Sequence, residues 1–170
     1  VRAGEIVGLG GLEGQGQRSA VRAIFGDQRF TQGIISVENT PLKSGGIAGR
    51  IRSGVAYVTH DRRGEGLVLT QSIRKNSSLA ALRRLCTPLG VVREGEERTQ
   101  VAGQMDSLQI KAFSMEELVS HLSGGNQQKV MLARWLMTKP RVLIIDEPTK
   151  GIDIGARMSI YQIIHQLTQS

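Results

Sequence analysis

Short apolar runs alternate with amphipathic stretches along this chain, and glycine-rich loops separate them. The runs at residues 5–9, 33–37 and 55–58 are each predicted to form a strand, and the second should enter a turn near residues 39–41. Residues 19–25 place apolar side chains on one face of a helix. The first part of the chain therefore predicts strands and helices in alternation.

The pattern becomes helical in the middle of the chain. Residues 71–121 show no convincing strand, and a Pro-Gly segment at residues 87–90 separates two helical stretches. Residues 142–145 then form a continuous apolar run, as expected for a parallel strand covered on both faces. A helix over residues 125–137 is predicted before this strand, and an amphipathic helix around residues 160–167 is predicted after it.

This order of elements predicts an α/β fold of three layers with a mostly parallel sheet and an inserted helical subdomain. We expect residues 1–170 to form a single domain. Residues 1–70 and 122–170 would form the α/β core, and residues 71–121 would form the helical subdomain.

The chain is basic, with a formal net charge of +7, and this invites a nucleic-acid interpretation. The basic residues are scattered, however, and aromatic residues make up only 4% of the chain, so platforms for stacking bases are scarce. A solvated surface with phosphate contacts is the better explanation of the charge, and we expect no nucleic-acid partner. The sequence has no apolar run of membrane-spanning length, and the single Cys86 favours a reducing compartment.

A degenerate phosphate-binding loop follows the first predicted strand. Its three glycines are Gly11, Gly14 and Gly16. In a complete loop a Lys reaches the phosphates and a Ser or Thr hydroxyl holds Mg²⁺, but Gln17 and Arg18 stand at these two positions and Ser19 follows them. Three interpretations remain open: nucleotide binding through backbone amides and Arg18, binding without hydrolysis, or a plain tight turn.

Two carboxylates end the apolar run at residues 142–145. Ligands of open α/β sheets bind beyond the carboxyl ends of the strands. There Asp146 would hold Mg²⁺ and Glu147 would act as general base toward an attacking water. The alternative is that Asp-Glu-Pro is a turn that simply ends the strand.

The segment at residues 122–128 reads Leu-Ser-Gly-Gly-Asn-Gln-Gln and starts a predicted helix. Ser123 is expected to be the N-cap of that helix. With the amides of Gly124 and Gly125, Ser123 can present hydrogen-bond donors and a helix dipole to a phosphate. The alternative is an ordinary capped helix start without a ligand.

Together these segments resemble the nucleotide-binding cassette of ABC transporters, and more narrowly the second cassette of the tandem ATPases that serve bacterial sugar importers. The residues that carry the resemblance are 60–67, 122–129 and 146–156. The resemblance implies a P-loop NTPase-like core, ATP and Mg²⁺ as cofactors, and two cassettes that face each other head to tail. Asp153 matches the loop that crosses the seam between the cassettes.

The resemblance also implies partners and a location. A second cassette, membrane permease subunits and, indirectly, a periplasmic sugar-binding protein would act with this chain at the cytoplasmic face of the bacterial inner membrane. A nucleic-acid or ribosome ATPase and a non-hydrolysing regulatory domain are the alternative functions. The family places the choice of solute in the binding protein and the permease.

The chain departs from the family at several points. His60 stands where cassettes usually carry Gln or Glu, so it is a candidate for sensing Mg²⁺ or the attacking water, or else a surface imidazole. An adenine-stacking aromatic and a switch histidine are both expected beyond the ends of this sequence. We therefore expect a cassette truncated at both ends, inactive as an isolated piece.

Overall fold

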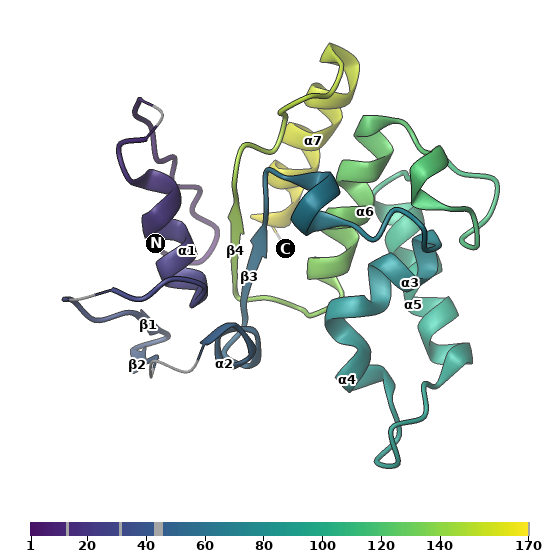
Figure 1. The fold of residues 1–170 in the computed structure, drawn as a ribbon, viewed down its shortest axis with the longest axis horizontal. Helices are drawn as coiled ribbons and strands as arrows, with labels where there is room; N and C mark the ends of the chain where they lie inside the picture. Colours follow the sequence, from purple (N-terminus) through teal and green to yellow (C-terminus); the bar gives the residue numbers. More distant parts are fainter. Residues whose placement is uncertain (13, 31, 43–45, 170) are drawn as a thin grey trace.

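Two parallel strands form the centre of the molecule. The structure is a computed structural model that describes residues 1–12, 14–30, 32–42 and 46–169. Strand β3 (Val55–Val58) pairs with β4 (Val142–Ile145), and the register runs from Val55 opposite Val142 to Val58 opposite Ile145 (Figure 1). Both strands have the predicted bounds. Every residue of β3 is buried, whereas β4 is only partly buried.

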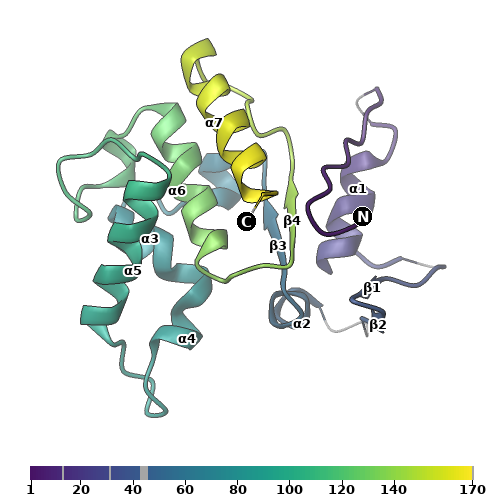
Figure 2. The same ribbon diagram turned by 180° about the vertical axis from the view of Figure 1, so that it is seen from behind.

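Helices cover the two faces of this strand pair, which gives the three layers that the sequence predicts. Helix α1 (Gln17–Phe25) lies on one side, and α2 (Gly46–Arg52) lies next to the start of β3. Helices α6 (Gly124–Leu136) and α7 (Ile154–Leu167) lie on the other side (Figures 1 and 2).

Successive side chains of β3 point to opposite faces of the sheet, and this explains why helices cover both faces. Val55 and Tyr57 pack with Phe25 of α1, while Val58 faces the opposite core, which α6 supplies with Val130 and its neighbours. A strand that is apolar on both faces can be stabilised only between two layers of helices.

The helical segment follows the end of β3. It contains α3 (Ile73–Ser78), α4 (Leu82–Leu85) and α5 (Glu94–Ser107). In the described part of the chain, residues 71–121 form no sheet strand, and only two isolated bridges occur there. The segment is helical, as predicted, but its domain boundaries stay a prediction. A 3₁₀ turn (Leu79–Ala81) interrupts the helical spacing between α3 and α4, and Leu79 is 44% exposed there.

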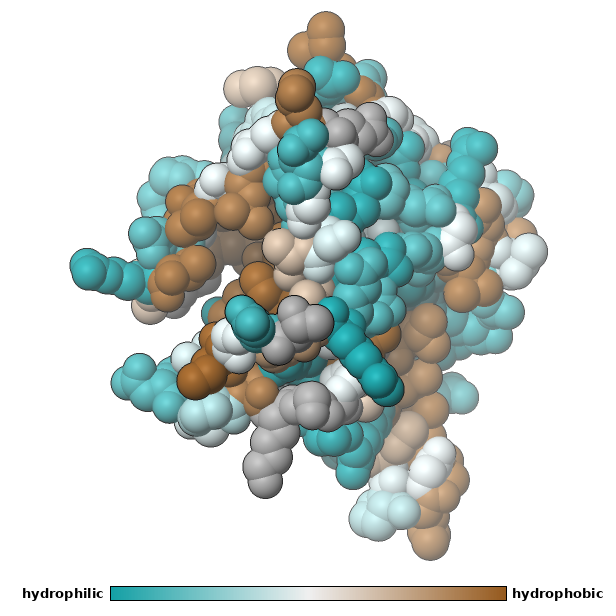
Figure 3. All heavy atoms as spheres, turned by 60° about the vertical axis from the view of Figure 1, so that its left-hand side comes forward, coloured by the Kyte–Doolittle hydropathy of each residue, from teal (hydrophilic) through white to brown (hydrophobic). Residues whose placement is uncertain are grey.

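The predicted strand at residues 5–9 is wrong. Ile6, Val7 and Leu9 are 58%, 51% and 61% exposed, and the segment forms no ladder with β4. A strand needs a hydrogen-bonded neighbour, and β4 pairs only with β3 among the described residues. Figure 3 shows hydrophobic side chains among hydrophilic ones on the face that it presents.

The predicted strand at residues 33–37 is shorter than expected. Only β1 (Ser36–Val37) pairs, with β2 (Thr40–Pro41), in an antiparallel hairpin. Glu38 and Asn39 form its turn with φ angles of 49° and 60°. Two successive left-handed residues make the tightest hairpin connection, so Thr40 and Pro41 belong to a strand and not to the predicted turn.

Candidate functional site

The glycine-rich loop leads directly into α1, as predicted. Gly14 and Gly16 have φ angles of 85° and 96°, in the left-handed region that only glycine adopts without strain. Gly16 is the N-cap of α1. A loop of this shape before a helix N-terminus directs backbone amides and a positive partial charge toward the same region, which suits an anion.

Gln17 turns back into this loop. Its Nε2 donates to the carbonyl oxygen of Leu12 at 3.2 Å, and a Cβ on Gly11 would collide with the same amide group. Gln17 therefore braces the loop, whereas the Lys expected at this position would reach a phosphate. A side chain at position 11 would displace the Gln17 amide from this contact.

Arg18 joins the loop to the carboxylates at the end of β4. Its Nε donates to Oδ2 of Asp146 at 3.0 Å, and its Nη2 donates to Oε1 of Glu147 at 3.2 Å. These residues are more than 120 positions apart in the sequence, so the fold brings together two segments that the sequence analysis treated separately. The guanidinium cancels negative charge beside the loop.

Asp146 is the centre of this cluster. Its Oδ2 also accepts from the Tyr57 hydroxyl at 3.0 Å and lies 3.0 Å from Nδ1 of His60. His60 follows β3 and Asp146 follows β4, so the parallel register places both at the same edge of the sheet. His60 therefore contacts the candidate site, and its catalytic role stays a prediction. Burial and the hydrogen bond to Asp146 raise the pKa of Tyr57, which keeps it a donor.

Glu147 is held in an unusual conformation. Its φ is 47°, a left-handed value that costs a non-glycine residue about 1–3 kcal/mol. The Lys150 ammonium lies 2.8 Å from its Oε2. Hydrogen bonding to Lys150 lowers the pKa of Glu147 against the opposing effect of burial, and the charges of Lys150 and Arg18 lower it further. Glu147 is therefore a weaker base than a free carboxylate.

The donor set around Asp146 does not fit the expected Mg²⁺. This ion requires oxygen ligands in near-octahedral geometry, and the position of the usual hydroxyl ligand carries the Arg18 guanidinium. Oδ2 of Asp146 is already within hydrogen-bond distance of Arg18, Tyr57 and His60. In the described ranges no group of three or more His, Cys, Asp or Glu side chains could hold a metal. The role of Asp146 toward Mg²⁺ stays a prediction, and in this arrangement Arg18, Tyr57 and His60 compete for its Oδ2.

A second cluster surrounds the start of α6. Ser123 is its N-cap, and Oγ accepts from the amide of Asn126 at 3.4 Å, as predicted. A Cβ on Gly125 would lie 2.6 Å from Cβ of Ala156 in α7, and one on Gly124 would lie 3.3 Å from the carbonyl oxygen of Gly151. The two glycines are thus needed for the close approach of this turn to the segment after β4.

Arg62 is the functional candidate that sequence reasoning missed. Its Nη1 donates to the carbonyl oxygen of Gly124 at 3.2 Å, and its Nη2 donates to that of Gly151 at 3.0 Å. Burial, aided by the charge of Arg63, lowers the pKa of Arg62. The basic loop at residues 60–67 was the only signal for it. One side chain after β3 therefore ties the α6 start to the segment that leads to Asp153.

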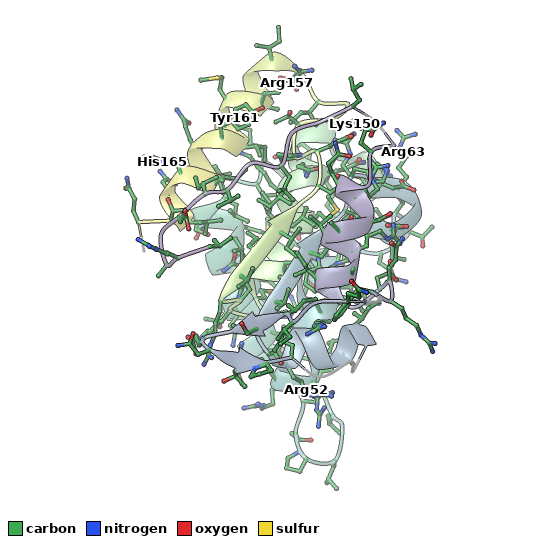
Figure 4. All side chains as sticks on the ribbon, turned by 90° about the vertical axis from the view of Figure 1, so that its left-hand side faces the viewer. Arg52, Arg63, Lys150, Arg157, Tyr161 and His165 are labelled. Atoms are coloured by element: carbon green, nitrogen blue, oxygen red, sulfur yellow. The ribbon has the colours of Figure 1, made fainter. Side chains whose placement is uncertain are left out.

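Asp153 caps α7, since its Oδ1 accepts from the amide of Ala156 at 2.9 Å. Arg62 therefore links the start of α6, at Gly124, to Gly151 shortly before Asp153, while the two carboxylates pair with Arg18. Figure 4 shows Arg63 and Lys150 near the end of α1 that carries the glycine-rich loop, and Arg52 far below them. No helix in the described part of the chain has both the length and the apolar character to cross a bilayer.

A parallel strand pair between helices, a glycine-rich loop before α1, a carboxylate pair after β4 and a capped Ser-Gly-Gly helix start define the class of ATP-binding cassettes. Residues 1–150 match the family model described as ABC transporter, and the chain belongs to this family. The resemblance stated from the sequence is confirmed.

Two curated relatives have names that concern ribose import. The chain is 43% identical over 169 residues to "Ribose import ATP-binding protein RbsA 3" of Rhizobium meliloti (strain 1021), covering 99% of the chain and 34% of that protein. It is 45% identical over 167 residues to "Ribose import ATP-binding protein RbsA 2" of Streptomyces avermitilis, covering 98% and 33%. The chain thus spans about a third of the length of these relatives.

Solved structures show the same fold. A dimeric ATP-binding cassette in a post-hydrolysis state, bound to ADP and Pi, has a TM-score of 0.83 at 20% identity and covers 99% of this chain and 72% of its own. The cbiO1 protein of Clostridium perfringens, part of the ABC transporter complex cbiONQ, has a TM-score of 0.74 at 23% identity, with coverages of 94% and 60%.

Proposed function

We propose that this chain is a nucleotide-binding cassette of a bacterial sugar importer, and specifically the second cassette of a tandem ATPase. The main support for this proposal is the turn at Ser123. Gly124, Gly125 and Arg62 hold this turn in place, so that it presents hydrogen-bond donors on the surface. The similarity to two ribose import ATP-binding proteins over nearly the whole chain supports the sugar-importer assignment.

In this proposal the chain acts at a seam with a partner cassette. Ser123 and the amides of Gly124 and Gly125 donate to the γ-phosphate of an ATP that the partner's phosphate loop holds, together with its Mg²⁺. Asp153 contributes from the segment that crosses the seam. ATP closes the seam and hydrolysis opens it, which gates the permease at the cytoplasmic face of the membrane.

The chain's own loop forms the weaker of two unequal sites. Gly11, Gly14 and Gly16 shape it, and Ser19 together with Arg18 contacts the phosphates. Gln17 braces the loop, and Glu147 is paired with Arg18 and Lys150. We infer that this site binds ATP and contributes little to its turnover, with His60 beside it as a sensor of the attacking water.

Glu147→Gln in the full-length protein is expected to change ATP turnover by no more than about twofold, because the residue serves a site that hydrolyses little. Steady-state phosphate release measures this. The matched control replaces the corresponding carboxylate of the partner cassette and should abolish turnover. A loss of tenfold or more for Glu147→Gln would instead make this chain's own site a working one.

Arg62→Met is expected to lower ATP turnover about tenfold. The variant loses the link between the start of α6 and Gly151, so the Ser123 turn is no longer held where it would meet the partner's nucleotide. Turnover and thermal unfolding are measured together. Arg63→Met, at an exposed neighbouring position, is the control and should leave both unchanged. Equal turnover in the two variants would show that Arg62 does not position the seam.

A further inference from the structure

We propose that the Arg18 guanidinium takes the place of Mg²⁺ in this chain's own nucleotide site, so that the site binds ATP without a divalent cation. The inference rests on the proposed function, since it concerns the same glycine-rich loop. It goes beyond that function because it assigns a different charge carrier to each of the two sites.

The position of Arg18 carries the first step. In a complete phosphate loop the residue at this place supplies the hydroxyl that holds Mg²⁺, and the carboxylate after the neighbouring strand completes that site. Arg18 occupies this place and bonds directly to that carboxylate, Asp146, at 3.0 Å. Nη2 of the same guanidinium also donates to Oε1 of Glu147 at 3.2 Å. The positive charge therefore lies between the loop and both carboxylates, where a metal ion would otherwise lie.

The charges around the glycine-rich loop also favour this role of Arg18. Asp146 and Glu147 bring two negative charges to a loop that must accept a triphosphate, and like charges at short range oppose binding. Arg18 and Lys150 bring two positive charges against them. The guanidinium has further N–H donors in a rigid fork, and its side chain is 36% exposed, so a phosphate can approach it.

Competition carries the third step. A divalent cation at Asp146 would lie close to the Arg18 guanidinium that is bound to Oδ2 of the same carboxylate, and two cations repel each other at that distance. Tyr57 and His60 use this oxygen as well. Arg18 and Mg²⁺ therefore exclude each other here. Because Arg18 is part of the chain, its guanidinium occupies the site and the ion does not bind.

The test measures the number of ATP molecules bound by the full-length protein, by equilibrium dialysis with labelled ATP. With Mg²⁺ we expect two per protein, and with excess EDTA we expect one to remain. Arg18→Ser, which restores the hydroxyl, should weaken EDTA-resistant binding about tenfold or more, and Mg²⁺ should recover it. Arg18→Lys, which keeps the charge, should retain EDTA-resistant binding. Arg52→Ser removes a positive charge from a distant exposed position and should change nothing.

The outcomes separate the two proposals. Two molecules with Mg²⁺ and none with EDTA would overturn the role of Arg18 and leave the cassette assignment intact. EDTA-resistant binding that survives Arg18→Ser in a folded protein would overturn it as well, and thermal unfolding establishes that the variant is folded. An absence of ATP binding with Mg²⁺ would instead remove the proposed function itself.

Discussion

Replacing Ser123 with Arg in the full-length protein is expected to lower ATP turnover by about 100-fold or more, a loss comparable to that of a donor aimed at developing charge. Ser123 lies at the capped start of α6, next to two glycines that leave no space for an added side chain against Gly151 and Ala156. Ser123 itself is exposed, so the long Arg side chain would extend outward, where the partner's triphosphate is expected. It would block closure of the seam.

Two controls separate this effect from damage to the helix. Ser120→Arg makes the same change at an exposed position three residues earlier and should alter turnover by no more than about twofold. Ser123→Ala removes the cap and should lower the free energy of unfolding by about 1 kcal/mol. Turnover and ATP binding are measured for all three variants. Normal turnover in Ser123→Arg would show that this turn faces no phosphate.

The parts of the fold that local pattern decides were predictable. The strands over residues 55–58 and 142–145 have the expected bounds because short, continuous apolar runs rich in β-branched residues suit a strand between two layers of helices. The capped start of α6 was predictable because a Ser before two glycines satisfies the first helical amides. Both features depend on neighbours in the sequence.

The parts that distant neighbours decide were not predictable. Residues 5–9 have strand composition, but whether they pair depends on a partner that the sequence pattern does not reveal. Arg18 was recognised as a departure from the phosphate loop, yet its bond to Asp146 spans the whole fold. Arg62 and Asn76 act through contacts with residues that are distant in the sequence, so spacing gave no indication of their partners.

Asn76 offers the strongest test of how the helical segment is held. Its side chain is 1% exposed, and its Nδ2 donates to the carbonyl oxygens of Val68, Gln71 and Ser72 at 2.9–3.2 Å. Its Oδ1 accepts from the Val68 amide at 2.9 Å and from Nη2 of Arg134 at 2.6 Å. One amide thus connects the loop after β3, α3 and α6. Burial lowers the pKa of Arg134 to about 10, and this guanidinium also donates to the Asn76 backbone carbonyl at 2.9 Å.

Asn76→Ala is expected to lower the free energy of unfolding by about 3–5 kcal/mol, because it leaves several buried polar groups without partners. Such a loss is a large part of the total stability of a typical domain, about 5–15 kcal/mol. Urea unfolding followed by the fluorescence of Trp135, the single tryptophan, measures it on the helix that carries Arg134.

Ser77→Ala is the matched control for burial. Ser77 is the next residue of α3 and is fully buried, but its Oγ has no hydrogen-bond partner in the part of the chain that the structure describes. Removing that hydroxyl should therefore leave the free energy of unfolding unchanged or raise it slightly. If both variants lost the same stability, packing would hold α3 against α6. A large loss for Asn76→Ala alone would show that the hydrogen-bond network fixes the helical segment to the helix that presents Ser123.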